Sequence, residues 1–261
     1  EEGYGKTNAV LVGLTVLVQI LTSYTQNKKS MKHFFQDAIC ILLGFKPALD
    51  AYRVGSGAEQ EDHQTFPPLT EMTLCKAIET VFEAIPSSIL QIYALLSARE
   101  KSLDAVISIL VSAATIAFTS SMLSYDWDTS PSNRTGTPFF YGFVPDKALG
   151  RAVCFLSMMS LTFAHVLLLT SACALLALTN SKWLMLFLGV DMGIFFLYKI
   201  MRGDFFYYIN LAGVLRFVMA IIERFGVKIM INFTMFMQLR HPQEAGGLPF
   251  AVSTLTSVVG R

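Results

Sequence analysis

Charged residues are scarce in this chain of 261 residues. They make up 15% of it, whereas ordinary globular domains contain about 25%. The net charge of +1, together with the lack of a long basic run, excludes nucleic acid as an expected partner. Hydrophobic residues make up 53%, and the mean hydropathy is +0.52. This composition is typical of a polytopic membrane protein rather than of one or two soluble domains.

Motifs of enzymes and of metal sites are also absent. The chain has no GxSxG, HExxH or P-loop motif and no Cys/His spacing that would hold zinc. The cysteines form no CxxC pair, and they lie in or beside apolar segments: Cys40, Cys75, Cys154 and Cys173. We therefore expect buried or lipid-facing thiols rather than a disulfide framework. We predict no enzymatic activity, no metal and no cofactor.

The chain begins at Glu1 rather than Met, and no signal peptide follows. We expect it to be a fragment or a domain of a longer protein. The first apolar segment, 8–25, is followed directly by Lys28, Lys29 and Lys32. By the positive-inside rule this basic loop is cytoplasmic, so the N-terminal end of the first helix is expected outside.

Apolar runs long enough to cross a bilayer, about 20 residues, recur along the chain. The segment 34–49 is shorter and is interrupted by Gly44 and Pro47, which favours a re-entrant segment. We predict an all-α polytopic helix bundle that forms a single integral membrane domain over 1–261. Its helices are expected at 8–25, 34–49 (re-entrant), 74–97, 103–125, 151–178, 183–201 and 211–237.

Two polar segments, 50–71 and 126–150, separate these runs and are expected to be solvated loops. His63 in the first loop is interpreted as a surface residue. The second loop holds an N-glycosylation pattern, "NRT", at 133–135. If 34–49 is re-entrant, this loop is cytoplasmic, so we expect the pattern to be unused.

Polar residues recur inside the apolar stretch "IETVFEAIPSSILQIYALL". Four of them stand at steps of four residues: Glu79, Glu83, Ser87 and Gln91. Each step drifts by only about 40° around an α-helix, so the four side chains form one polar ribbon. Pro86 lacks the N–H that the helix needs at its position, and it predicts a kink.

A charged side chain at the centre of a bilayer costs about 2.5–3.5 kcal/mol on insertion scales. Glu79 and Glu83 are therefore expected to face the bundle interior and to pair with cations. The last apolar segment carries candidates, since Arg216 and Glu223 share one helical face and Arg224 lies on an adjacent one. We predict that the two carboxylates meet Arg216 or Arg224.

Two further charges lie inside the apolar segment 183–201. We predict that Asp191 and Lys199 form a second polar pair or join the same network. His165, alone in an apolar helix, is interpreted as a helix–helix hydrogen bonder. All these charges have two interpretations: they line a functional path, or they are buried pairs that only fix the register of the helices.

The stretch "ETVFEAIPSSILQIYALL" resembles the "ETxxExxPQLxLQLYxLL" signature of the XK and XK-related membrane proteins. Six residues match it: Glu79, Glu83, Pro86, Leu90, Gln91 and Tyr93. The next helix is similar to the Ser-rich helix of that family, with the match at its end carried by Ser124, Tyr125 and Asp126. "LVQILTSY", "LLGFKPALDAYR" and "WLMLFLGVDMGIFFLY" are similar to the family's second helix, re-entrant region and late helices, in the same order.

The resemblance covers about 8–198. It implies an all-helical protein that scrambles phospholipids along polar residues or serves a lipid-transfer partner. The sequence departs from the family pattern at three places. Ser87 replaces the Gln that follows the proline, Asp50 stands where the re-entrant motif has Arg, and the first family helix, with two acidic residues, has no counterpart.

We predict a passive scramblase-like protein that moves lipid headgroups along an intramembrane polar groove. The expected path is lined by Glu79, Glu83, Ser87, Gln91, Asp191, Lys199, Arg216, Glu223 and Arg224. Phospholipids are the expected partners, a protein partner or a dimer is left open, and the membrane is the plasma membrane or that of an organelle. Two alternatives stay open: an ion or solute channel or transporter that uses the same charges, and a membrane scaffold for a lipid-transfer partner.

Overall fold

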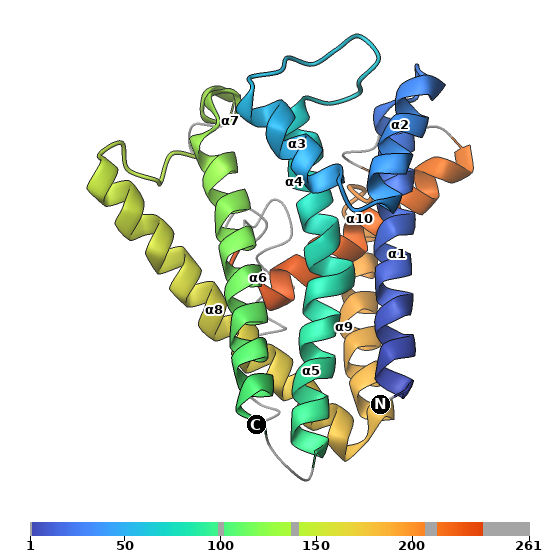
Figure 1. Cartoon of the computed structure of the whole chain (residues 1–261), viewed down its shortest axis with the longest axis vertical. Helices are drawn as coiled ribbons and strands as arrows, with labels where there is room; N and C mark the ends of the chain where they lie inside the picture. The colour runs from blue at the N-terminus through green and yellow to red at the C-terminus, as the bar shows by residue number, and fades with distance from the viewer. Residues whose placement is uncertain (1, 99–101, 137–140, 207–212, 237–261) are drawn as a thin grey trace. The chain divides into compact units, whose positions relative to one another are not determined.

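The computed structural model describes residues 2–98, 102–136, 141–206 and 213–236. Across these ranges the regular structure is entirely helical (Figure 1), which confirms the predicted all-α class. The elements are α1 (Glu2–Gln26), α2 (Met31–Leu42), α3 (Lys46–Gly55), α4 (Pro68–Glu79), the π-helical turn η1 (Thr80–Ala84), α5 (Ile85–Ser97), α6 (Leu103–Thr129), α7 (Pro131–Gly136), α8 (Ala148–Thr179), α9 (Ser181–Met201) and α10 (Gly213–Phe233).

Five helical segments of the described chain are long and apolar enough to cross a membrane. They are Gly5–Gln26, Pro68–Ser97, Leu103–Thr129, Ala148–Thr179 and Ser181–Met201. Each exceeds the length of about 20 residues that a bilayer requires, so the prediction of a polytopic membrane protein is confirmed. The chain divides into two compact units, Glu1–Ser87 and Ser88–Arg261, which we call unit 1 and unit 2.

The outer faces of these helices are apolar, and polar side chains lie inside. On α9, Trp183 and Leu197 are exposed whereas Lys199 is buried. On α8, Leu168 is exposed whereas Thr170 is completely buried. A helix of a soluble protein shows the opposite arrangement, with its apolar stripe toward the core. The distribution of side chains therefore supports contact with lipid independently of helix length.

In unit 1, the segment predicted as re-entrant forms two short helices, α2 and α3, of 12 and 10 residues. Each is too short to span a bilayer. Gly44 between them has φ +74, a left-handed conformation that favours glycine. Phe35, Ile39 and Phe45 are exposed, whereas Asp37 is buried. This helical hairpin therefore turns its apolar side outward and its charges inward.

The prediction of a solvated loop over 50–71 is wrong at both ends. Helix α3 continues through Asp50, and Glu71 lies in the first turn of α4. Both carboxylates are 1% exposed. They are buried because Lys46, equally buried, lies between them as a counter-charge. The connection that remains between the two helices is 56–67.

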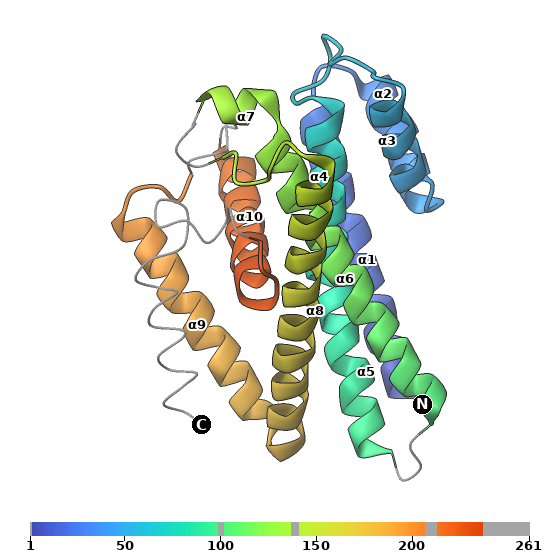
Figure 2. The same cartoon turned by 90° about the vertical axis from the view of Figure 1, so that its left-hand side faces the viewer.

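In unit 2, α6 and α8 pack against each other (Figure 2). Ala113 and Ala117 on α6 are completely buried, and such small residues let helix backbones approach closely in lipid. Near one end of the contact, the ring of Phe155 meets those of Phe118 and Tyr125 edge to face, at 5.8 and 6.1 Å between centroids. Small residues and aromatic rings thus hold these two spans together.

The prediction of a solvated loop over 126–150 is wrong for the first residues of this segment. Helix α6 extends to Thr129, and Asp128 is completely buried. The Asp128 carboxylate accepts hydrogen bonds from the backbone N–H groups of Gly142 (2.8 Å) and Val144 (2.9 Å), and Arg134 pairs with it at 3.3 Å. The described part of this connection is therefore folded around one buried carboxylate.

Candidate functional site

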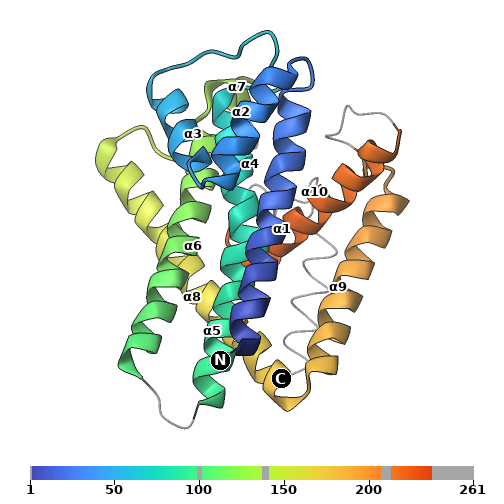
Figure 3. The same ribbon diagram turned by 45° about the vertical axis from the view of Figure 1, so that its right-hand side comes forward.

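A row of polar contacts joins α1 to the segment 68–87 within unit 1, and we call it the polar seam. Gln26 donates to Glu71 (3.0 Å), Gln19 donates to Glu79 (3.3 Å), and Ser87 donates to Asn8 (3.4 Å). Figures 1 and 3 show α1 running alongside α4. At 1.5 Å per residue, the contacts spread over about 27 Å of α1 and about 24 Å of the opposite segment. The hydrocarbon core of a bilayer is about 30 Å thick, so the seam covers most of that depth.

Helix α1 turns its polar side chains inward along this seam. Thr15, Gln19 and Thr22 are buried, whereas Val10 and Leu17 are 70% and 54% exposed. The Thr22 hydroxyl donates to a backbone carbonyl one turn back, so its burial leaves no donor unpaired. The side of α1 that faces the seam is therefore lined by polar residues, while its opposite side is apolar.

The π-helical turn η1 ends at Ala84, two residues before Pro86. Its hydrogen bonding runs over five residues, with the N–H of Ile85 donating to the carbonyl of Thr80. Proline cannot donate a backbone hydrogen bond, and a wider turn accommodates this loss. The structure thus has a π-turn just upstream of Pro86, and the kink predicted at Pro86 stays a prediction. Because a step of four residues is slightly less than one such turn, Glu79 and Glu83 stay on one side of the segment.

A buried group of five charges lies at one end of the seam, and we call it the charge cluster. Lys46 Nζ is 3.2 Å from Asp37 Oδ2 and 2.9 Å from Asp50 Oδ1, and it also donates to Glu71. These four side chains are 3% exposed or less. Arg53, at the rim and 26% exposed, lies 3.3 Å from Asp37 Oδ1. Helices α2, α3 and α4 therefore meet around a single lysine.

Three carboxylates and two cations leave the charge cluster one negative charge in excess when all are ionised. The Asn27 side-chain amide stabilises part of this excess by donating to Asp37 at 2.9 Å. Burial by itself lowers the pKa of Lys46, but the attraction of Glu71 and of the two aspartates outweighs burial and raises that pKa above its ordinary value. Lys46 therefore remains charged at every physiological pH.

The residues of the charge cluster were not predicted as site residues. Asp50 was named from the sequence only as a departure from a family motif. A local signal exists, since Lys46, Asp50 and Arg53 stand at i, i+4 and i+7 on one helical face. A second signal is Asp37, the one carboxylate between Met31 and Leu49. Glu71 offers no such signal, because it joins the others from a segment that is distant in sequence.

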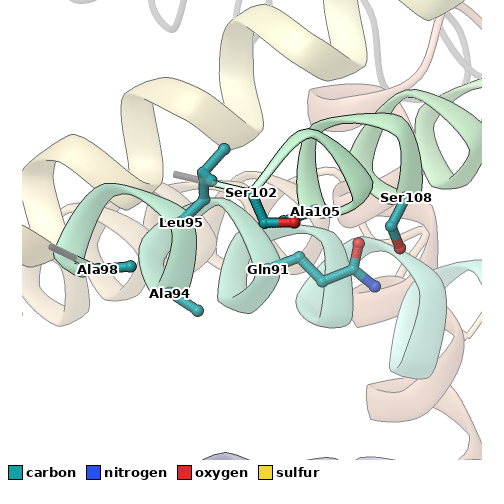
Figure 4. Close-up of a pocket in the computed structure, with 7 residues that line it drawn as sticks. All are labelled: Gln91, Ala94, Leu95, Ala98, Ser102, Ala105 and Ser108. Carbon is teal, nitrogen blue, oxygen red and sulfur yellow. The ribbon is translucent and has the colours of Figure 1, made fainter. Parts of the chain in front are cut away.

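Gln91, the last residue of the predicted ribbon, belongs to unit 2, where its side-chain oxygen accepts a hydrogen bond from Ser112 on α6 at 3.2 Å. It borders an open cavity of about 330 Å³ (Figure 4). The lining consists of Gln91, Ala94, Leu95, Ala98, Ser102, Ala105 and Ser108. Since Glu79, Glu83 and Ser87 belong to unit 1, the continuity of the four-residue ribbon stays a prediction.

Asp191 and Lys199 do not pair with each other, so the first of the two predicted alternatives is wrong. That they join the network of Glu79 and Glu83 stays a prediction. The Asp191 carboxylate meets Lys228 of α10 at 2.8 Å and accepts a hydrogen bond from Asn232 at 2.6 Å. Lys199 instead lies 2.9 Å from the carboxylate of Asp204, just after α9 ends. The two residues stand eight apart on one helix, and each finds a nearer partner on a neighbouring segment.

His165 joins α8 to α10. Its Nε2 lies 2.7 Å from the backbone carbonyl oxygen of Asn232, so the interpretation of this residue as a helix–helix hydrogen bonder is confirmed. The Lys228 ammonium, besides its pairing with Asp191, lies 5.8 Å from the centroid of the Phe195 ring, a cation–π distance. Three helices of unit 2, α8, α9 and α10, thus share one connected polar group.

Arg224 is 1% exposed and is held mainly by backbone carbonyls. Its Nε donates to the carbonyl of Phe205 at 3.0 Å, and its Nη2 donates to that of Asp204 at 2.9 Å. Its Nη1 is 3.8 Å from the carboxylate of Glu223. The planar guanidinium suits this role, since its fixed donors can satisfy several acceptors at once. Arg224 therefore ties α10 to the chain that follows α9.

Arg216, unlike Arg224, is not buried. It is exposed, and its guanidinium carbon stands 4.9 Å from the centroid of the Phe206 ring. The predicted meeting of Glu79 and Glu83 with Arg216 or Arg224 would join unit 1 to unit 2, and it stays a prediction.

Comparisons of the chain with protein-family models, with curated proteins and with solved structures found no match. The resemblance to the XK-related proteins therefore stays a prediction. What the structure shows is a helical membrane protein with five candidate spans and buried polar groups in both of its units.

Proposed function

We propose that this protein is a passive lipid transporter of the scramblase type, in which the polar seam of unit 1 guides phospholipid headgroups across the bilayer. The observation that supports this proposal is the extent of the seam. Its polar contacts are spread over about 24–27 Å of helix, against a hydrocarbon core of about 30 Å. Polar contacts that only fix the packing of two helices do not need to recur over that whole distance.

The chemistry of the seam suits a headgroup. Glu79 and Glu83 attract the ammonium or choline group of a zwitterionic lipid, while the amide of Gln19 and the hydroxyl of Ser87 can donate to its phosphate. Without such partners a headgroup loses its hydration on entering hydrocarbon, a cost similar to that of burying an unpaired ion. The exposed apolar faces leave the lipid tails in the membrane. Transport of this kind runs down a gradient and requires no nucleotide.

The test is lipid movement in vesicles reconstituted with the full chain. A fluorescent headgroup-labelled lipid in both leaflets is quenched from outside, and the fraction that becomes accessible with time gives the rate of transfer. We expect the wild-type protein to move lipid, and Glu79→Gln combined with Glu83→Gln to slow it about tenfold. That factor corresponds to the loss of about one hydrogen bond to a charged group.

Glu59→Gln is the matched control, because it makes the same change in the exposed part of the connection 56–67. It is expected to leave the rate unchanged. Ion flux is measured in the same vesicles, and thermal stability is measured for each variant. Ion flux without lipid transfer by the wild-type protein would overturn the proposal in favour of a channel. Slower transfer accompanied by an equal loss of stability would reduce the seam to a structural role.

A further inference from the structure

Two histidines and one glutamate come together near the N-terminal end of α2 in unit 1. They belong neither to the seam nor to the charge cluster. His33 lies in the first turn of α2, and Glu61 and His63 lie in the connection 56–67. One ligand atom from each of the three lies within 4.8 Å of those of the other two. The Nδ1 of His63 is 3.3 Å from the Glu61 carboxylate. The His63 side chain is 16% exposed and that of Glu61 is 67% exposed, so the interpretation of His63 as a surface residue is not contradicted.

We propose that His33, Glu61 and His63 form a Zn²⁺ site that fastens the connection 56–67 to the start of α2. Two imidazole nitrogens and one carboxylate oxygen are ligands that zinc prefers, and three protein ligands leave a fourth position for water. Ligand atoms about 2.1 Å from a tetrahedral metal are about 3.4 Å apart. The His63–Glu61 pair already has this separation, and His33 needs to approach by about 1.4 Å at most.

The surroundings hold the three ligands in place. The Ser30 hydroxyl is 2.8 Å from Nδ1 of His33. Ligating histidines commonly use their second ring nitrogen in such a hydrogen bond, which fixes the orientation of the ring. In the connection, the N–H of Glu61 donates to the buried side chain of Gln64 (3.1 Å), and Lys29 donates to the carbonyl of Asp62 (3.2 Å). The backbone on both sides of the site is therefore already anchored.

The two imidazole rings are stacked, with centroids 4.0 Å apart and an interplanar angle of 15°. A ligating lone pair lies in the plane of its ring, so two parallel rings cannot both point at one metal. Binding must tilt the rings away from each other while drawing their nitrogens together.

No metal site was predicted from the sequence, because the three ligands do not stand at the short fixed spacings of known metal motifs. Glu61 and His63 are separated by a single residue, but His33 lies far upstream of both. The hairpin of α2 and α3, together with the contacts of Thr65 with Thr25 and Gln26, brings the two segments together. No choice of spacing rule would have identified this group, since the intervening length depends on that hairpin.

The test uses the purified full chain in detergent with Co²⁺ as a spectroscopic probe and Zn²⁺ as its competitor. We expect one Co²⁺ per chain, visible d–d absorption without the near-ultraviolet bands of thiolate ligation, and displacement by an equimolar amount of Zn²⁺. His33→Gln and His63→Gln are each expected to weaken Zn²⁺ binding at least 100-fold. Ser30→Ala, which removes only the orienting contact, is expected to weaken it about tenfold.

Asp62→Asn is the matched control for Glu61→Gln, because both remove one carboxylate from the same connection and only Glu61 is a proposed ligand. Wild-type affinity in Asp62→Asn together with weaker binding in Glu61→Gln supports the site. A folded double variant, His33→Gln with His63→Gln, that binds Zn²⁺ within threefold of wild type would overturn it. Equal competition by Ca²⁺ or Mg²⁺ would overturn it as well, since these ions prefer all-oxygen ligands. Each variant is compared by circular dichroism to establish that its helices are intact.

Discussion

Lys46 is the central cation of the charge cluster, and its replacement by Met is expected to destabilise unit 1 strongly. The ammonium contacts Asp37, Asp50 and Glu71, all of them buried. Methionine has a similar length and no charge, so the substitution leaves the packing nearly unchanged while removing the counter-charge. The excess of carboxylates over cations then grows from one to two.

The magnitude follows from the burial of the partners. Breaking a buried ion pair by removing one member costs about 3–5 kcal/mol, because the remaining charge has no compensation. Lys46 has three such partners, which favours the upper end of this range. Arg53 offsets part of the loss from the rim, since it lies 3.3 Å from Asp37 and 3.8 Å from Glu71. We therefore expect a loss of about 4 kcal/mol and a fall of the thermal midpoint on the order of 10 °C.

The pH dependence distinguishes this electrostatic effect from poor packing. The raised pKa of Lys46 stabilises the folded state fully below the ordinary lysine pKa of about 10.4, and this stabilisation is lost only as the pH rises through the raised value. The contribution of Lys46 to the free energy of unfolding of the wild-type protein therefore does not change between pH 5 and 9. In Lys46→Met, proton uptake by a buried carboxylate relieves the repulsion, so the deficit relative to wild type should shrink toward pH 5.

The assay is the thermal unfolding of the purified full chain in detergent at several pH values. Lys28→Met is the matched control, because Lys28 is exposed, and its midpoint should stay within about 2 °C of wild type. Lys46→Met combined with Asp50→Asn restores an excess of one carboxylate and should regain part of the loss. A single variant as stable as wild type at pH 7, or a double variant no better than the single one, would refute the reasoning.

Two further predictions concern the other irregular and charged positions of the spans. Asp191→Asn and Lys228→Met are each expected to lower the free energy of unfolding by about 2 kcal/mol. A double-mutant cycle measured by thermal unfolding should give a coupling energy of about 1–3 kcal/mol. Additive losses would contradict a direct pair. Pro86→Ala supplies the missing backbone donor, so we expect it to replace the π-turn by regular α-helix and to raise the free energy of unfolding by about 1 kcal/mol. The change of register would move Glu79 off the seam and slow the proposed lipid transfer. A variant with unchanged transfer would show that the turn has no functional role.

The sequence was sufficient for the spans and insufficient for the pairing of charges. Long apolar runs predict spanning helices because a bilayer requires both length and hydrophobicity, and each of the five candidate spans overlaps a predicted one. The charge pairs depend on which helices become neighbours. Asp191 and Lys199 were paired because they share a helix, whereas their partners come from other segments.

The polar residues of the seam were predicted from the sequence, but the contacts between them were not. The spacing of Glu79, Glu83 and Ser87 indicates one polar side of a helix, and Gln19 is a polar residue inside an apolar span. That Gln19 and Glu79 meet could not be derived, because periodicity orients a helix about its own axis without selecting its neighbour. The π-turn is equally hidden, since a proline in a helix can also produce a simple kink.

The carboxylates of Glu71 and Glu79 in unit 1 have two different kinds of partner, and the difference bears on the proposed transport. Glu71 contacts a buried cation, and separating such a pair costs about 3–5 kcal/mol. Glu79 accepts a hydrogen bond from the neutral amide of Gln19, and such a bond to a charged group contributes about 1.5–3 kcal/mol.

A headgroup that moves along the seam must replace each contact in turn, so the contacts at Glu79 and Ser87 exchange more readily than the one at Glu71. The charge cluster therefore sets the highest barrier on the proposed path.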